Sequence, residues 1–218
     1  MARGSGSSGG GATDKVQTAA TYQGSLRTWS LRYWINAPSA GIQSLFFKGT
    51  GGSSTCILRL VPGDLLSFSQ RWTAGGIWNF PLAGYLGWHS IQIVYDAGDP
   101  ANVPFIWQDA VAQTLVPTPP TGAVVTDLTP WLLFNRADSL RVLDGMLADV
   151  AMWSVLLPTD EVLSLAAGVA ARLIHPADRV FDVPMYSTID DYANAIQPTV
   201  TGTLSQTHPV PSILPGSY

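Results

Sequence analysis

Apolar and polar side chains alternate over short stretches along most of the chain. This period of two is typical of strands that present alternate residues to opposite faces of a sheet. It is clearest in residues 28–35 (TWSLRYWI) and in residues 88–95 (WHSIQIVY). The alternation places on one face Trp29, Leu31, Tyr33 and Ile35 in the first stretch, and His89, Ile91, Ile93 and Tyr95 in the second.

Weaker strand patterns fill much of the rest of the chain. They cover residues 43–48, 55–61, 65–72, 77–82, 105–108, 110–115, 131–135 and 179–183, with a rigid proline-rich loop expected at 117–122. Turn residues separate these segments at the spacing that is typical of sandwiches and jelly rolls. The pattern therefore predicts an all-β fold, a two-sheet antiparallel jelly-roll sandwich that buries its aromatic side chains between the sheets.

The stretch 143–168 (LDGMLADVAMWSVLLPTDEVLSLAAG) reads as a turn, a strand and one short helix near the C-terminal end. Asp144-Gly145 is a dipeptide that favours a turn. Thr159 or Asp160 is expected to cap the helix, and Gly168 is expected to end it. The strand alternation in 145–153 places on one face Met146, Ala148, Val150 and Met152.

Three regions of different composition divide the chain. Residues 1–20 begin with a run of glycine and serine, which predicts a flexible N-terminal arm. Residues 21–185 hold the strand patterns and form the predicted sandwich. Residues 186–218 are rich in Pro, Thr and Ser and predict an extended tail that lies over this domain or over a neighbouring molecule.

Charged residues make up only 12% of the 218 residues, and two of them are lysines, Lys15 and Lys48. This is about half the usual share. Protein interfaces are depleted of Lys, Glu and Asp, so the composition fits a subunit whose faces are covered by neighbours. A neutral surface rich in Thr, Ser and Gln explains it as well. The net charge of −4 and the scattered basic residues predict no nucleic-acid partner.

Membrane and thiol chemistry are not expected from this sequence. No apolar run is long enough to span a bilayer, and the start MARGSGSSGGG lacks the apolar segment of a secretion signal. Cys56 is the only cysteine and lies in an apolar run, so it is expected to be an inert core thiol. The three histidines share no spacing, and none is assigned as a ligand or base.

Trp72, Trp78 and Asn79 flank the glycine pair Gly75-Gly76. Exposed aromatic rings beside an amide can stack on a sugar, so these three residues form a candidate carbohydrate-binding site. The alternative is that both tryptophans are core residues, as most tryptophans in a sandwich are.

The order of the motifs resembles the concanavalin A-like lectin/glucanase superfold in its LamG-like form, over residues 26–183. The resemblance rests on TWSLRYWI, GWHSIQIVYD, VPFIWQDAV and above all the closing stretch 143–168. The chain departs from that family at Asp109-Ala110, where the family has Asp-Gly, and in lacking a recognisable opening strand. The closing segment through residue 185 is similar to LamG-like proteins encoded by tailed bacteriophages.

This resemblance implies binding without catalysis. Glucanases of the superfold use a pair of catalytic carboxylates on one strand face, typically within a Glu-x-Asp-x-Glu motif, which is absent here, so no catalytic residue is expected. LamG-like domains sometimes hold Ca²⁺ at the sandwich rim, but turn-forming roles explain the available side chains equally well, and neither a metal nor another cofactor is expected. The rim residues in question are Asp96, Asp99, Asn102, Asp127, Asn135 and Asp138.

The resemblance to phage proteins implies a virion role. We expect a capsid decoration subunit, made in the host cytoplasm, that binds the major capsid protein or other virion proteins and adds binding free energy to the shell. Capsid geometry favours a homo-oligomer, for which a trimer is the natural guess. The alternative is a lectin-like module of a head fibre or tail that binds glycans of the host surface. A glycoside hydrolase is the third and weakest alternative.

Overall fold

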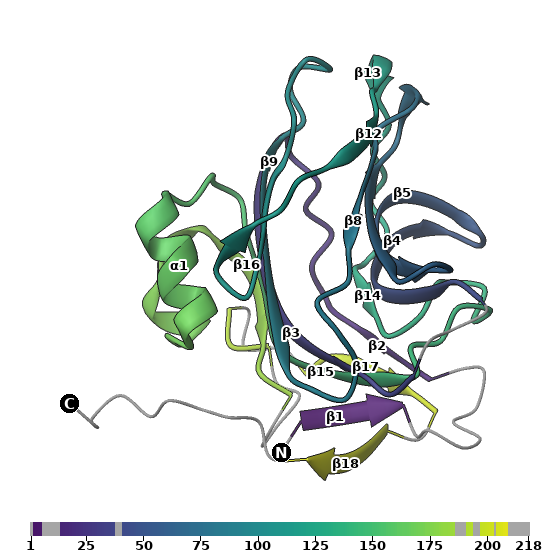
Figure 1. The fold of residues 1–218 in the computed structure, drawn as a ribbon, viewed down its shortest axis with the longest axis vertical. Helices are drawn as coiled ribbons and strands as arrows, with labels where there is room; N and C mark the ends of the chain where they lie inside the picture. The colour runs from purple at the N-terminus through teal and green to yellow at the C-terminus, as the bar shows by residue number, and fades with distance from the viewer. Residues whose placement is uncertain are drawn as a thin grey trace.

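Two antiparallel sheets stack face to face and a helix lies against one of them (Figure 1). This computed structural model describes residues 2–5, 14–37, 41–185, 191–193, 197–202 and 204–208. The predicted all-β sandwich with one short helix near its C-terminal end is confirmed. Among the described residues, no helix has the length and apolar character needed to cross a membrane.

Sheet A has eight strands, and its path runs along β11, β10, β9, β3, β15, β1 and β18, with β16 also paired to β15. Their bounds are β11 (Val111–Ala112), β10 (Phe105–Gln108), β9 (His89–Asp96), β3 (Leu26–Ile35), β15 (Gly145–Trp153), β1 (Ala2–Ser5), β18 (Leu204–His208) and β16 (Arg179–Val183).

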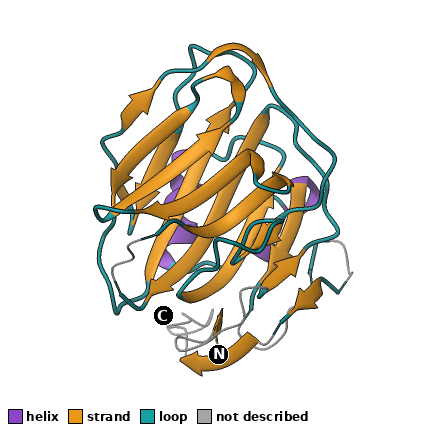
Figure 2. Cartoon of the chain, turned by 90° about the vertical axis from the view of Figure 1, so that its right-hand side faces the viewer, coloured by secondary structure: helices purple, strands orange, loops and turns teal. Residues whose placement is uncertain are grey.

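Sheet B also has eight strands, in the order β12, β8, β6, β5, β4, β14, β2 and β17. Figure 2 views the molecule from the side of this sheet, with the helix behind the strands. Their bounds are β12 (Val116–Thr118), β8 (Ile77–Pro81), β6 (Leu65–Gln70), β5 (Ser53–Val61), β4 (Gln43–Thr50), β14 (Leu132–Leu133), β2 (Lys15–Gln17) and β17 (Thr199–Thr201).

The strands β7 (Trp72–Ala74) and β13 (Thr121–Val124) form a separate two-stranded ribbon. Together with β12, β13 replaces most of the rigid loop that the sequence predicts at 117–122. The prediction was wrong because β12 is an edge strand, where the missing N–H of Pro117 is tolerated. Gly122 takes a positive φ of 78° within β13.

Helix α1 (Thr159–Ala167) covers the outer face of sheet A, and two short 3₁₀ helices follow it, η1 (Ala171–Leu173) and η2 (Pro176–Asp178). Gly168 ends α1 with a φ of 105°, as predicted. The predicted cap is wrong: Pro158 occupies the N-cap position and no side chain caps the helix. Packing of Val162 and Leu165 against sheet A therefore fixes the helix in place.

Aromatic rings fill the space between the sheets. Trp29 stacks on Phe46 at a centroid distance of 5.8 Å and meets Phe68 and Trp131 edge-on at 5.4 and 6.0 Å. The indole N–H of Trp131 is satisfied by the carbonyl of Tyr22 at 3.0 Å. Such offset and edge-on pairs add to the stabilisation that burial alone provides.

The alternation in β3 and β9 is confirmed for the residues predicted to share a face. Trp29, Leu31 and Ile35 of β3 and Ile91 and Ile93 of β9 all lie in the core between the sheets. The two strands pair along their length without interruption. They are the strands that the sequence defines best.

Strand β15 corrects the predicted alternation. Its register against β3 shifts between Ala148 and Ala151, and Asp149 there takes a φ of 49°. Such a bulge inserts one residue and exchanges the faces that follow it. Val150 therefore faces the inter-sheet core, whereas Met146 and Ala148 pack on the outer face of sheet A.

The two ends of the chain contribute strands to both sheets. Within the region predicted as a flexible arm, Ala2–Ser5 form β1 and Lys15–Gln17 form β2, which supplies the missing opening strand. Within the predicted tail, β17 pairs with β2 and β18 pairs with β1. Such strands of three to five residues, with at most one apolar residue each, carry too little periodicity to be read from sequence.

Candidate functional site: a cleft on the outer face of sheet B

A cleft opens where the chain leaves sheet B and returns to it. Strand β6 ends at Gln70, the chain then forms β7 of the separate ribbon, and β8 rejoins the sheet at Ile77. The cleft has a volume of about 410 Å³, a size that suits small ligands. Its lining residues are Gly52, Ser53, Ser54, Ser69, Arg71, Trp72, Thr73, Ala74, Gly75 and Ile77.

Gly75 and Gly76 make this return possible. Their φ values are +70° and +82°, the left-handed region that favours glycine. A Cβ on Gly75 would lie 2.0 Å from the carbonyl oxygen of Pro119, and one on Gly76 would lie 2.1 Å from that of Gln70. The close backbone approach therefore fixes one end of the cleft.

The cleft wall is rich in hydroxyl groups. Ser53, Ser54, Ser69 and Thr73 line it together with the exposed side chain of Arg71. The Thr73 hydroxyl accepts a hydrogen bond from the Ala123 N–H at 3.1 Å, which holds the β7–β13 ribbon in place. Hydroxyl and guanidinium groups can exchange hydrogen bonds with a polyhydroxylated ligand.

The structure separates the three residues of the predicted sugar site. Trp78 is 1% exposed and packs between the sheets, and Trp72 is 3% exposed, although it contributes to the cleft wall. Neither ring has the exposure that stacking on a sugar requires, and the burial of both agrees with the core alternative. Asn79 is half-buried and pairs with Ser67 on the outer face of sheet B. Its position is on the same sheet face as the cleft.

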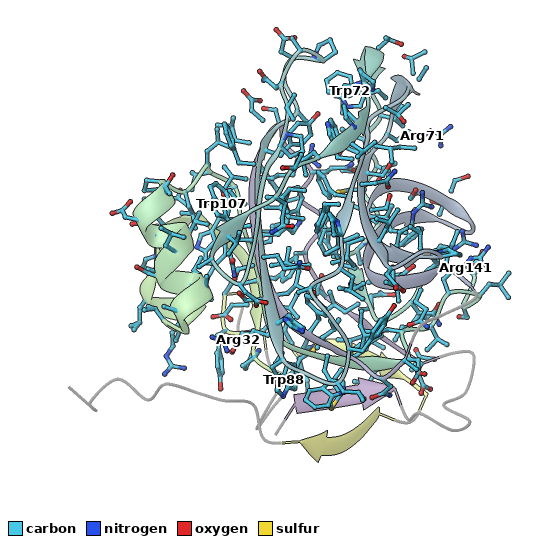
Figure 3. All side chains as sticks on the ribbon, viewed as in Figure 1. Arg32, Arg71, Trp72, Trp88, Trp107 and Arg141 are labelled. Atoms are coloured by element: carbon cyan, nitrogen blue, oxygen red, sulfur yellow. The ribbon has the colours of Figure 1, made fainter. Side chains whose placement is uncertain are left out.

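Arginine side chains gather beside the cleft on this face. The strand register places Ser44, Arg59, Ser67 and Asn79 in one row across β4, β5, β6 and β8. The Ser44 N–H donates to the carbonyl of Arg141 at 2.8 Å, so Arg141 continues that row. Figure 3 shows Arg141 and Arg71 on the side of sheet B that faces away from sheet A.

A third arginine connects this row to the cleft. Arg136 Nη1 donates to the carbonyl of Gly52, a cleft residue, at 3.4 Å. Its guanidinium also pairs with the Asp138 carboxylate through Nε and Nη2. Burial opposes ionisation of Asp138, but the hydrogen bonds from Arg136 and from the Leu140 N–H hold its pKa below the ordinary value.

Arg59 lies in an unfavourable electrostatic environment. Burial, followed by repulsion from Arg136 and Arg141, lowers the pKa of Arg59 below its ordinary value. The three guanidinium groups therefore interact across the outer face of sheet B.

Solved structures with the same fold superpose on most of the chain. A heptameric SAP-like pentraxin from Limulus polyphemus gives a TM-score of 0.64 at 12% identity, over 88% of this chain and 87% of that chain. An inferred carbohydrate-binding protein from Bacteroides ovatus gives 0.61 at 15% identity, over 88% of this chain. The chain spans 59% of the Bacteroides protein.

A third structure is the CBM40 of the Ruminococcus gnavus IT-sialidase bound to α2,3-sialyllactose. It gives a TM-score of 0.50 at 11% identity, over 65% of this chain and 83% of that chain. The chain has the concanavalin A-like β-sandwich fold. No protein-family model and no curated protein sequence matches it.

The rim carboxylates of this concanavalin A-like sandwich are occupied by turns and ion pairs. Asp96 accepts from the Gly98 N–H and Asp99 from the Ala101 N–H, both at 2.8 Å, as turn-forming aspartates do. Asp127 accepts from the Thr55 hydroxyl at 2.8 Å. The described residues contain no group of three or more His, Cys, Asp or Glu side chains placed to hold a metal.

Cys56, His89 and His175 lie in defined structural surroundings. Cys56 is fully buried, and burial raises the pKa of its thiol to about 12, which matches the predicted inert core residue. His89 Nδ1 lies 2.6 Å from the Asp109 carboxylate, and His175 lies near Glu161 and Asp178.

Sequence reasoning missed the arginines of the outer face. Arg59 interrupts the apolar run of β5, which is a usable signal for a functional position on a strand. Arg136 and Arg141 lie in a loop after β14, and nothing in the sequence shows that this loop crosses β4 and β5. Only the fold brings the three side chains together.

Proposed function

We propose that the chain is a carbohydrate-binding module and that the cleft beside the β7–β13 ribbon is its sugar site. The observation that carries the proposal is an open, hydroxyl-lined cleft of about 410 Å³ on the outer face of a sheet. Two of the superposed structures are described as carbohydrate-binding or are bound to a sugar. The module would act by binding, without turnover of the ligand.

Hydrogen bonding would dominate recognition in this cleft. Ser53, Ser69 and Thr73 supply hydroxyl donors and acceptors, and Arg71 supplies a planar donor group at the edge. Ile77 offers a small apolar contact on the cleft floor. This arrangement differs from the tryptophan-stacking site that the sequence predicts.

Two substitutions of alanine by tryptophan, one in the cleft and one far from it, test the site. Ala74→Trp fills the cleft, whereas Ala167→Trp places the same side chain on the exposed side of α1, over the opposite sheet. Glycan-array screening followed by calorimetry should show sugar binding that Ala74→Trp abolishes and Ala167→Trp retains. The proposal fails if no glycan binds at millimolar concentration, or if binding is unchanged in Ala74→Trp.

Capsid decoration is the second candidate function, and exposed apolar side chains favour it. Phe105 is 68% exposed and stacks on Trp107 at 6.1 Å, and Val111 of the neighbouring edge strand is 63% exposed. Exposed apolar side chains at a sheet edge suit contact with another protein, such as a capsid subunit or a sister copy. Co-purification with virus particles at hundreds of copies each would support decoration, and absence from particles would reject it.

A further inference from the structure

Three arginines on the outer face of sheet B form a positive group in a protein whose net charge is −4. Arg59, Arg136 and Arg141 are all half-buried, and each side chain reaches this face from β5 or from the loop after β14. Lys15 lies beside that loop, where its ammonium group donates to the Ala137 carbonyl at 3.4 Å and to the Ser139 hydroxyl at 3.3 Å.

In the described part of the chain, Arg59 and Arg141 form no ion pair within 4 Å, although the Asp138 carboxylate held by Arg136 also attracts Arg141. Arg136 takes the Asp138 carboxylate, whereas the side chains of Arg59 and Arg141 donate no hydrogen bond to any described residue. The Nε atoms of both are buried without a partner. Half-buried guanidinium groups are normally paired, because desolvation of an unpaired charge is costly. An anion placed between them would supply the missing acceptors.

Polar atoms beneath the arginines point to the same conclusion. The hydroxyl oxygens of Ser44 and Ser67 are buried without a partner in the described structure, and these residues flank Arg59 in the transverse row. Buried polar groups are normally hydrogen-bonded. An acceptor-rich ligand at this position would give these donors partners.

The arginine group is continuous with the cleft. Ser67 and the cleft residue Ser69 are two residues apart on one face of β6, which corresponds to about 7 Å. Arg136 contacts the cleft residue Gly52 directly. A single substituent on a ligand that fills the cleft is therefore long enough to reach the guanidinium groups.

We propose that the ligand is an acidic glycan, whose neutral sugar occupies the cleft while its carboxylate or sulfate group binds between Arg59 and Arg141. This inference rests on the proposed carbohydrate-binding function. Guanidinium groups match planar carboxylates and sulfate oxygens through paired charge-assisted hydrogen bonds. Low exposure of the arginines would strengthen these bonds, because the surrounding dielectric is lower than that of water.

A glycan array that pairs each neutral oligosaccharide with its sialylated, uronic acid and sulfated forms tests the proposal. The full chain should bind one acidic form at least about tenfold more tightly than its neutral counterpart, as expected for a charge-assisted pair. The carboxylated and sulfated members then identify which anion is preferred. Raised ionic strength should weaken binding of the acidic form more than that of the neutral one.

Substitutions locate the anion. Arg59→Gln and Arg141→Gln should each remove most of the preference for the acidic form while leaving the affinity for its neutral counterpart unchanged. Arg59→Lys should keep part of the preference, because it retains charge without the planar pair of donors. Arg172→Gln is the matched control, since Arg172 is exposed in η1 on the sheet A side of the molecule.

The outcomes separate the two proposals. Equal or tighter binding of the neutral forms, or an acidic preference that survives Arg59→Gln and Arg141→Gln, overturns the acidic-glycan inference and leaves sugar binding intact. Absence of binding to every glycan overturns both. Retained affinity for a neutral glycan shows that a variant is folded, so a loss of preference cannot be a loss of structure.

Discussion

Lys48 occupies an inward position of β4, where the surrounding apolar residues give no sign of a buried charge. Its ammonium group donates to the carbonyl of Thr21 at 2.9 Å and to that of Thr129, and lies 5.3 Å from the Trp131 ring centroid. Burial lowers the pKa of Lys48, although the carboxylate of Asp127 opposes that change. One of the two lysines is thus a core residue, and the surface is even poorer in charge than the composition implies.

Asp109 and Ala110 form the turn between β10 and β11, with φ values of 51° and 63°. A Cβ in this left-handed region is strained, and the exposed Ala110 side chain gains nothing in return. Ala110→Gly should therefore raise the free energy of unfolding by up to about 1 kcal/mol. Chemical denaturation measures the change.

The control for this prediction is Ala112→Gly, in the neighbouring strand β11. Ala112 is also exposed but has an extended backbone, so glycine there should lower stability by about 0.5–1 kcal/mol. Equal effects of the two substitutions would contradict the strain argument.

Burial raises the pKa of Asp182 to about 6, despite the Arg179 guanidinium at 2.8 Å. Between about pH 4 and pH 6 the folded chain then binds more protons than the unfolded chain. Below about pH 4 the carboxyl is protonated in both states, and the free energy of unfolding has its full value. As the pH rises through 6, this free energy falls by up to about 3 kcal/mol, because the folded state opposes ionisation of Asp182.

Asp182→Asn should flatten the pH dependence of the free energy of unfolding in this window, whatever its effect on absolute stability. Carbon-detected NMR titration of the Asp182 carboxyl gives the direct measurement. A midpoint near pH 4 in the folded protein would contradict the prediction.

At the scale of single elements, β15 depends on its first residue. A Cβ on Gly145 would lie 2.0 Å from the carbonyl oxygen of Trp34 in β3. Gly145 thus serves close strand approach, and its φ does not lie in the positive region that the predicted turn dipeptide favours.

Gly145→Ala should destabilise the fold by about 2 kcal/mol or more, because the two central strands of sheet A must move apart. Gly84→Ala is the control, since a Cβ at Gly84 would meet only His89 at 3.6 Å, an ordinary contact. Thermal unfolding should show a large decrease in Tm for Gly145→Ala alone. Similar Tm values for both variants would count against this account of the strand pair.

Strands could be predicted where the alternation continues over eight or more residues. β3 and β9 have that length, and their inward residues follow the pattern. The alternation cannot reveal the bulge at Asp149, because an inserted residue leaves every residue type in place while it exchanges the faces. Strand β2 has a single buried residue, Val16, and its pairing with β14 and β17 is a tertiary effect.

On the scale of the whole molecule, β15 is bordered by two different strands on one side. Strand β1 pairs with Met146 and Leu147, whereas β16 pairs with the second half of β15, from Val150 to Trp153. The N-terminal strand therefore protects only one half of a central strand.

Deletion of residues 1–13 should increase amide hydrogen exchange in the first half of β15 and leave the second half protected. Exchange followed by mass spectrometry resolves the two halves, and the peptide containing β9 serves as an internal reference. Uniform protection along β15 in the deletion variant would show that β1 contributes nothing to it.

The fold was more predictable than the site. Period, turn residues and the closing helix define a sandwich, since these are local properties of the sequence. The cleft and the arginine group depend on which strands become neighbours: Arg59 and Arg141 are far apart in sequence and meet because Ser44 lies between them. The sequence also does not show which side chains are exposed, and for that reason Trp72 and Trp78 were candidates for contact with a sugar.

The excursion from Arg71 to Gly76 combines fixed and free positions. Trp72 and the two glycines are held by the core and by backbone contacts, whereas Arg71, Thr73 and Ala74 are exposed. The side chains of Arg71 and Ala74 can be exchanged without disturbing the sheets, whereas the Thr73 hydroxyl also holds the β7–β13 ribbon. Libraries restricted to Arg71 and Ala74 would show how the proposed sugar site selects its ligand while every layer of the scaffold stays the same.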